Sequence, residues 1–314
     1  IKTRMNYLKN IYTKKHSLFI LLFLSFAGIS LAQITQKTKV FLLAGQSNMD
    51  GRGDASKLSE AEMKLLTNAS QKIHFVYKGT VGEGNAIRYN GALDFTNPWN
   101  FVKQKFRIEK CFGPELFFGV ELVKNYPKQD YLFIKRSQGG TSLYGAWNPN
   151  WSFEKASFFN EQDKPKLYQD FIDLVDAELA ELHPDSYEIV GMLWVQGETD
   201  SNTSNGSVAA DTYHLNLESL INSVRDHYDI PDLPFLIVGV GSKKVQKAMV
   251  QVSNKLTNVS FIERSQDVNR SNYTPIYTHK WNGKTVGHYN YEGMKQIGQL
   301  FFKSYQTSYA NNLQ

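Results

Sequence analysis

A serine and two polar amides follow directly after a short apolar run at residues 40–44. The run Val40-Phe-Leu-Leu-Ala44 is typical of a strand buried on both faces of a parallel sheet, and Gly45-Gln-Ser-Asn48 comes next. Open α/β sheets bind their ligands at the carboxyl ends of their strands. Ser47 therefore stands where a serine can act as a nucleophile, with backbone N–H groups beside it to receive an oxyanion. On these residues alone, Ser47 could also simply cap the following turn.

Two more polar blocks follow predicted strands. Ser137-Gln-Gly-Gly-Thr-Ser142 comes after the apolar run 131–134, and its adjacent glycines let backbone amides approach a ligand closely. Trp194-Val-Gln-Gly-Glu-Thr-Asp200 ends another apolar run, in which Gln196 and Glu198 stand out. Burying such groups unpaired costs several kcal/mol, so they are poor core residues. Together with the first block, these loops predict one site at one edge of the sheet.

A serine nucleophile needs a base, and a histidine near the end of the chain is the best candidate. His288 lies in Val286-Gly-His-Tyr-Asn-Tyr-Glu-Gly293, just before the last predicted helix, where the chain returns to the sheet edge. His279 lies in the same region and is the weaker candidate. The remaining histidines beyond residue 32 fall inside or at the end of predicted strands and helices.

The rest of the sequence alternates between apolar runs typical of strands and amphipathic stretches typical of helices. This order predicts a parallel sheet with helices on both faces. No repeat or linker interrupts residues 33–314, which we expect to form one domain. The expected strands are 40–44, 72–77, 131–134, 189–195, 235–240 and 259–262; the expected helices are 57–67, 113–123, 166–182, 211–227, 245–256 and 291–304; and 81–101 and 138–157 are expected to be long loops.

The first 32 residues have the pattern of a secretory signal peptide. Met5 and several lysines precede an apolar stretch at 17–29, and Ser30-Leu-Ala32 offers the small residues of a cleavage site. The stretch is short for a transmembrane helix. We therefore expect residues 1–32 to be removed, which leaves a secreted or periplasmic protein without a stable membrane anchor.

The charge and the single cysteine exclude several classes of function. Residues 1–32 hold five of the 35 basic residues and none of the 30 acidic ones, so residues 33–314 are neutral overall. Nothing there favours nucleic acid or an anionic membrane as a partner. Cys111 is the only cysteine, which excludes an internal disulfide, and no Cys/His cluster resembles a zinc site. We expect no bound metal.

In combination, these blocks resemble the SGNH hydrolase superfamily, and within it carbohydrate esterase family 6 and the sialate O-acetylesterases. The resemblance spans about residues 39–305. It rests on Gly-Gln-Ser-Asn-Met (45–49), Gly-Pro-Glu-Leu (113–116), Gly-Gly-Thr-Ser-Leu (139–143), Gln-Gly-Glu-Thr-Asp (196–200) and His-Tyr-Asn-Tyr-Glu-Gly (288–293).

This resemblance implies a fold, an activity and a set of roles. The fold would be a flavodoxin-like three-layer α/β/α sandwich around a central parallel sheet. The activity would be removal of acetyl groups from O-acetylated sugars without metal or cofactor. Ser47 would be the nucleophile and His288 the general base. The backbone N–H groups of Ser47 and Gly140, with the side chain of Gln196, would form the oxyanion hole.

One position departs from the pattern of the superfamily. Many SGNH enzymes have an aspartate three residues before the histidine, where it orients the imidazole, but here that residue is Thr285. The resemblance then points to Glu198 as the acid of a Ser-His-acid triad. Asp200 and Asp267 stay open as alternatives.

The expected partner is an O-acetylated oligo- or polysaccharide, such as acetylated xylan or an O-acetylated sialic acid. Gln46, Asn48, Trp147 and Trp151 are the candidate contacts to sugar, since aromatic rings stack on sugar faces. Packing beneath long loops is the alternative for the rings. The cations near the blocks that could bind a sialate carboxylate are Lys135, Arg136 and Arg52.

Two other functions remain open from the sequence. One is an esterase or lipase for acyl esters that are not sugars, which a wide apolar groove near Ser47 would favour. The other is a glycan-binding protein without activity, for which Thr285 is the only support.

Overall fold

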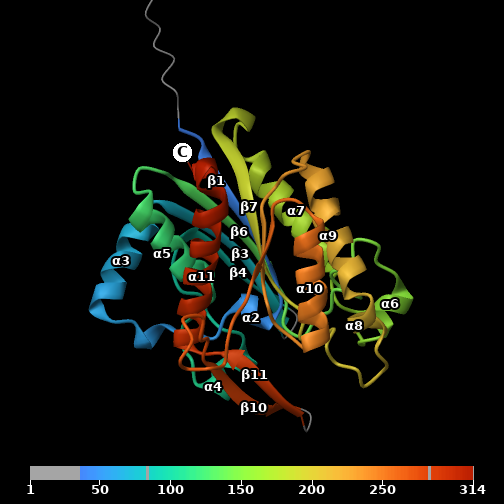
Figure 1. Ribbon diagram of the computed structural model, residues 1–314. Helices are drawn as coiled ribbons and strands as arrows, with labels where there is room; N and C mark the ends of the chain where they lie inside the picture. Colours follow the sequence, from blue (N-terminus) through green and yellow to red (C-terminus); the bar gives the residue numbers. More distant parts are fainter. Residues whose placement is uncertain (1–35, 83–84, 282–283, 314) are drawn as a thin grey trace, which may run out of the picture. The chain divides into compact units, whose positions relative to one another are not determined.

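The computed structural model describes residues 36–82, 85–281 and 284–313. Residues 37–314 form one compact unit, drawn in Figure 1. The predicted signal peptide, residues 1–32, lies outside the described residues. Within the described residues, no helix is long and apolar enough to span a membrane.

A seven-stranded sheet forms the centre of the unit, in the order β4-β3-β6-β1-β7-β8-β9. Six strands are parallel, as predicted, and β4 at the edge runs antiparallel to β3. The strand β4 lies inside the segment 81–101 that the sequence predicted as a loop; its Gly- and Asn-rich composition conceals an edge strand that needs only one paired neighbour. The strands are β1 Thr38–Gly45, β3 Ile73–Gly82, β4 Asn85–Ala92, β6 Tyr131–Ser137, β7 Tyr187–Val195, β8 Phe235–Val238 and β9 Val259–Ile262.

Helices cover both faces of this sheet, so the predicted α/β sandwich is confirmed (Figure 1). Each presents a stripe of buried apolar side chains; in α7 these include Phe171, Val175 and Leu179. The helices α3 Glu60–Ser70, α5 Glu115–Asn125 and α11 Tyr291–Tyr309 lie on one face, and α7 Leu167–Ala180, α9 Tyr213–Tyr228 and α10 Lys243–Lys255 lie on the other.

The central strand β1 positions the first polar block. Its neighbours β6 and β7 end level with it, because Gly45 pairs with both Ser137 and Val195. A Cβ on Gly45 would lie 2.1 Å from Val195 O, so only glycine fits between these strands. Directly after Gln46, the chain turns into the short helix α2 Ser47–Asp50. The three polar blocks therefore meet at one edge of the sheet.

Beyond this edge lie a hairpin and a short helix that the sequence did not predict. The hairpin pairs β10 Ile276–Trp281 with β11 Lys284–Tyr289, and α4 Asn100–Phe106 lies beside it (Figure 1). The remaining elements are short: β2 Gly53–Asp54 paired with β5 Cys111–Phe112, α6 Phe153–Ser157, α8 Val208–Asp211 and the 3-10 turns Ala55–Lys57, Pro184–Ser186 and Ala310–Leu313.

Candidate active site

Ser47 and His288 meet at the carboxyl edge of the sheet. Ser47 is the first residue of α2, and His288 lies near the end of β11, just before α11. The distance from Ser47 Oγ to His288 Nε2 is 3.0 Å. Ser47 is 7% exposed, and His288 is half-buried. This is the geometry that a serine nucleophile and its general base require.

Two backbone N–H groups beside Ser47 are available to an oxyanion. Gly139 lies against Ser47, since a Cβ built on it would be 3.7 Å from Ser47 Cβ. Gly140 follows with a φ of +63°, and a Cβ built on it would have no neighbouring atom within 4 Å. No described residue accepts a hydrogen bond from Ser47 N or Gly140 N. These N–H groups can therefore both serve a ligand.

Asn48 connects the carboxylate of Glu198 to the backbone of Tyr289, the residue after His288. Asn48 Nδ2 donates to Glu198 Oε1 over 2.6 Å, and Tyr289 N donates to Asn48 Oδ1 over 3.1 Å. Glu198 Oε2 is buried and accepts no hydrogen bond from a described residue. Burial raises the pKa of Glu198, although the hydrogen bond from Asn48 and the charge of Arg264 act against the increase. Where the sequence suggested a direct bond to His288, Glu198 instead holds the backbone next to it.

The two alternative acids lie elsewhere. Asp267 is exposed, and its side chain accepts hydrogen bonds from Asn269 alone among the described residues, within its own turn. Asp200 is 1% exposed and lies beneath the second polar block, where Leu143 N and Tyr144 N each donate to it over 2.9 Å. Its described partners are these two N–H groups of the loop 138–146, which carries Gly139 and Gly140 and which we call the glycine loop, and the side chain of Gln196; the imidazole of His288 is not one of them.

The side chain of Gln196 binds the same loop and its support, Asp200. Its Nε2 donates to Asp200 Oδ2 over 2.6 Å and to Thr141 O over 3.0 Å, which uses both hydrogens of the amide. Gln46 Oε1 is farther away, at 3.3 Å. The side chain of Gln196 is completely buried. It therefore fixes the glycine loop, in contrast to the role of oxyanion donor that the resemblance implied.

Glu161 holds the glycine loop from its other side, and no motif in the sequence pointed to it. Its carboxylate accepts hydrogen bonds from Ser142 N, Ser142 Oγ and Ala146 N, at 2.8, 2.7 and 3.0 Å. The side chain is completely buried, and burial raises its pKa although Lys164 lies 3.8 Å away. Glu161 belongs to an irregular segment whose composition does not differ from that of a surface loop.

Asp50, the last residue of α2, was also missed. Its carboxylate accepts from Ser137 Oγ over 2.5 Å and from Tyr77 Oη over 3.1 Å, and it also accepts from Thr80 Oγ1. These partners come from β6 and β3, so Asp50 ties the nucleophile helix to two neighbouring strands. Its place three residues after Ser47 was the only available signal.

The three basic side chains that the sequence offered for a sialate carboxylate are buried and bound to other protein groups. Lys135 Nζ lies 2.6 Å from Glu115 Oε2, and both side chains are 1% exposed. Arg136 is fully buried and donates to Asp170 Oδ2 over 2.6 Å. Arg52 donates to Gly51 O over 2.7 Å. They stabilise the structure under the site, and substrate cannot reach them.

The candidate sugar contacts are mostly internal as well. Gln46 and Asn48 are 3% and 4% exposed and bind other polar blocks. Trp147 is completely buried, donates to Thr141 Oγ1 and packs edge-on against Trp194. Trp151 is half-buried, with Lys166 Nζ 4.3 Å from its ring centroid. Packing beneath a loop was the correct interpretation for Trp147.

Two further observations bear on ligands. Among the described residues, no group of three or more His, Cys, Asp or Glu side chains could hold a metal ion.

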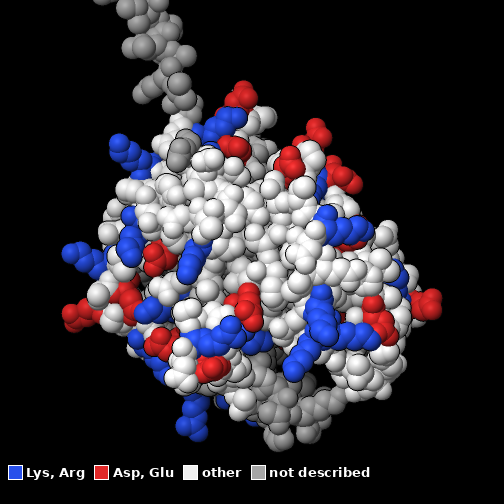
Figure 2. Space-filling view, viewed as in Figure 1, with Lys and Arg blue, Asp and Glu red and all other residues white. Residues whose placement is uncertain are grey.

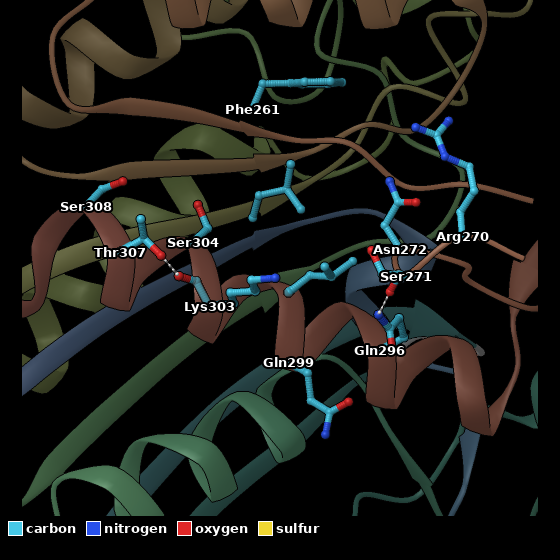
Figure 3. A pocket seen from close by; sticks show the side chains of 12 residues that line it. Phe261, Arg270, Ser271, Asn272, Gln296, Gln299, Lys303, Ser304, Thr307 and Ser308 are labelled. Carbon is cyan, nitrogen blue, oxygen red and sulfur yellow. Dashed lines mark hydrogen bonds between the residues drawn. The ribbon is translucent and has the colours of Figure 1, made fainter.

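A hollow of about 620 Å³ runs along α11 (Figure 3). Its lining includes Gln296 and Lys303 of that helix, and Phe261 and Arg270. Neither Ser47 nor His288 lines it.

Comparison with known proteins identifies the family and the fold of the chain. A family model described as carbohydrate esterase, sialic acid-specific acetylesterase matches residues 37–307. No curated protein sequence matches the chain. A protein from Arabidopsis thaliana is similar in structure, with a TM-score of 0.57 and 20% identity over 87% of this chain and 99% of that chain.

Two further structures have the same fold. NanS has a TM-score of 0.55 and 16% identity, over 88% of this chain and 99% of that chain. A carbohydrate acetylesterase from Xanthomonas citri has a TM-score of 0.54 and 13% identity, over 87% of this chain and 57% of that chain. The chain therefore belongs to the carbohydrate esterase family of sialic acid-specific acetylesterases, and it is a carboxylic ester hydrolase with an SGNH-type fold.

Proposed function

We propose that the chain is an exported serine esterase that removes O-acetyl groups from a glycan. The contact of 3.0 Å between Ser47 Oγ and His288 Nε2 carries this proposal. The two N–H groups of Ser47 and Gly140 support it, because an acetyl carbonyl needs such donors when it becomes an oxyanion.

The proposed reaction has two steps. His288 Nε2 takes the proton of Ser47, and Ser47 Oγ attacks the acetyl carbonyl. Hydrogen bonds from Ser47 N and Gly140 N hold the oxyanion. The tetrahedral intermediate then collapses, the C–O bond to the sugar breaks, and His288 returns the proton to the sugar oxygen. Water next attacks the acetyl-enzyme by the same route and releases acetate.

Glu198 is the proposed acid of the triad. Its Oε1 is bound by Asn48, while its buried Oε2 accepts no hydrogen bond from a described residue. A carboxylate there favours the charged imidazolium that forms during the reaction. Catalytic hydrogen bonds are often longer in a free enzyme and tighten when substrate binds.

The proposed location is the periplasm or the exterior of the cell, on the basis of the signal-like residues 1–32. In Figure 2, Lys and Arg side chains and Asp and Glu side chains are both scattered over the visible face, and its centre is largely uncharged. Acetylated xylan and O-acetylated sialic acid are the substrates to compare.

The test measures acetate release by purified protein from both glycans, and hydrolysis of p-nitrophenyl acetate against longer acyl esters. Ser47→Ala and His288→Ala should each abolish acetate release while the melting temperature stays near that of the wild type. His183→Ala is the control, since this side chain is 75% exposed on the surface. Activity of Ser47→Ala near the wild-type value contradicts the mechanism. A preference for long acyl chains contradicts the glycan substrate.

A further inference from the structure

A row of aromatic rings leads away from the imidazole of His288. Phe106 lies 5.8 Å from His288 between ring centroids, Phe101 lies 6.4 Å from Phe106, and Trp99 lies 5.1 Å from Phe101. All three rings belong to α4 or to the residue that precedes it. We call Trp99, Phe101 and Phe106 the α4 aromatic row.

Helix periodicity gives α4 an inner and an outer side. Val102 is completely buried, and Trp99 and Phe106 lie three residues before it and four residues after it, on the same side of the helix. Lys103 and Gln104 are exposed on the outer side. The side that carries Trp99 and Phe106 therefore faces the protein and ends at His288.

The aromatic row is only partly buried. Trp99, Phe101 and Phe106 are half-buried, whereas the core tryptophans Trp147 and Trp194 are completely buried. The indole N–H of Trp99 also donates to no described residue, although the atom is buried. An unpaired buried donor is unfavourable unless a partner supplies an acceptor.

We propose that the α4 aromatic row binds sugar rings of the acetylated glycan. This inference rests on the proposed function. Pyranose rings have apolar C–H faces that stack on aromatic side chains, and their hydroxyl groups accept hydrogen bonds from an indole N–H. Phe106 borders the sugar whose acetyl group is removed, and Trp99, two ring contacts farther from His288, binds a neighbouring sugar of the chain.

A test compares substrates of different length. Wild type, Trp99→Ala and Trp99→Phe are assayed with p-nitrophenyl acetate, p-nitrophenyl butyrate, an acetylated monosaccharide and the acetylated oligosaccharide that the wild type hydrolyses fastest. Phe153→Ala is the matched control, because Phe153 is 66% exposed on α6. Melting temperatures report on folding.

We expect Trp99→Ala to raise KM for the oligosaccharide about 3–10-fold, with a much smaller change for the monosaccharide and p-nitrophenyl acetate. Trp99→Phe should recover most of the loss, and Phe153→Ala should match the wild type. Binding of the oligosaccharide to Ser47→Ala protein should weaken by a similar factor when Trp99→Ala is added.

Equal KM changes for all substrates, or an oligosaccharide KM unaffected by Trp99→Ala, overturn the inference while leaving the esterase intact. A change confined to p-nitrophenyl butyrate means that the row binds acyl chains, and it also overturns the inference. A wild type that cleaves p-nitrophenyl acetate but no acetylated glycan overturns both the glycan substrate and this role of α4.

Discussion

Gln196 Nε2 donates a hydrogen bond of 2.6 Å to Asp200 Oδ2, and both side chains are buried beneath the glycine loop. Asp200 also receives the N–H groups of Leu143 and Tyr144. The third polar block therefore acts as a support for the second block, which carries Gly140. Because Gly140 N is a proposed oxyanion donor, the geometry of the active site depends on the Asp200 carboxylate, which need not touch the substrate.

Replacing Asp200 by asparagine tests this support. An amide NH₂ would then face an N–H donor of the loop and leave it unpaired, so the free energy of unfolding should fall by about 1–3 kcal/mol. Displacement of Gly140 should lower kcat for p-nitrophenyl acetate by ~10–10²-fold, with little change in KM. Asp267→Asn, at an exposed turn, should be close to the wild type. Equal effects of the two substitutions contradict the role of Asp200.

Stability should also depend on pH through Asp200. Burial raises the pKa of Asp200 to about 7, although hydrogen bonds from Gln196 and from the loop N–H groups lower it. Since the folded pKa is above the ordinary value of 3.8, the folded state binds the proton more tightly than the unfolded chain. The resulting stabilisation is present below pH ~4 and is lost as the pH rises through 7.

Urea unfolding of the wild type and of Asp200→Asn at pH 5 and pH 8 measures this contribution. The difference in free energy of unfolding between the wild type and Asp200→Asn should be smaller at pH 8 than at pH 5 by on the order of 1–3 kcal/mol. Only the wild type releases this proton as the pH rises. The pKa of Glu161 is also raised by burial, and Glu161 is present in both proteins. A difference that is constant with pH contradicts the assignment.

The sequence predicts the parts of the site that short motifs encode. Ser47 and His288 could be predicted because each lies where an apolar run or a terminal helix fixes the local chain direction. The contacts of Asn48 with Glu198 and of Glu161 with Ser142 could not, because they join segments whose separation in space depends on the packing of the whole sheet. The antiparallel β4 and the hairpin β10–β11 were missed because their Gly, Asn, Lys and Thr residues lack a strand-like apolar pattern.

The buried pair of Lys135 and Glu115 should be essential to stability. Their charged groups are 2.6 Å apart and 1% exposed, and Gly113 N also donates to Glu115. Glu115→Gln leaves the ammonium of Lys135 buried without a counter-charge, so the free energy of unfolding should fall by about 3–5 kcal/mol.

A surface pair provides the control for Glu115. Lys39 and Glu188 are 2.8 Å apart, but the side chain of Glu188 is 50% exposed. Glu188→Gln should therefore cost less than about 1 kcal/mol. Both variants are compared by urea unfolding at pH 7. Similar losses in the two variants contradict the view that burial makes the Lys135–Glu115 pair different.

Glu198 is connected through Asn48 to Tyr289 N, so substitutions at Glu198 and Asn48 should both affect turnover. Glu198→Gln removes the carboxylate to which Asn48 donates while nearly preserving volume, so kcat should fall ~10²–10⁴-fold with the fold intact. Asn48→Ala should also lower kcat, because it removes the amide that links Glu198 to the backbone after His288.

A variant with both substitutions shows whether Glu198 acts through Asn48 or directly on the imidazole of His288. If Glu198 acts mainly through Asn48, the double variant should be little worse than the more damaged single variant. If the losses multiply, Glu198 acts on His288 independently of Asn48, which requires a side-chain movement that brings Oε2 to the ring when substrate binds. Full activity of Glu198→Gln contradicts its role as the triad acid in either case, because the charge of the carboxylate would then contribute nothing to the imidazolium.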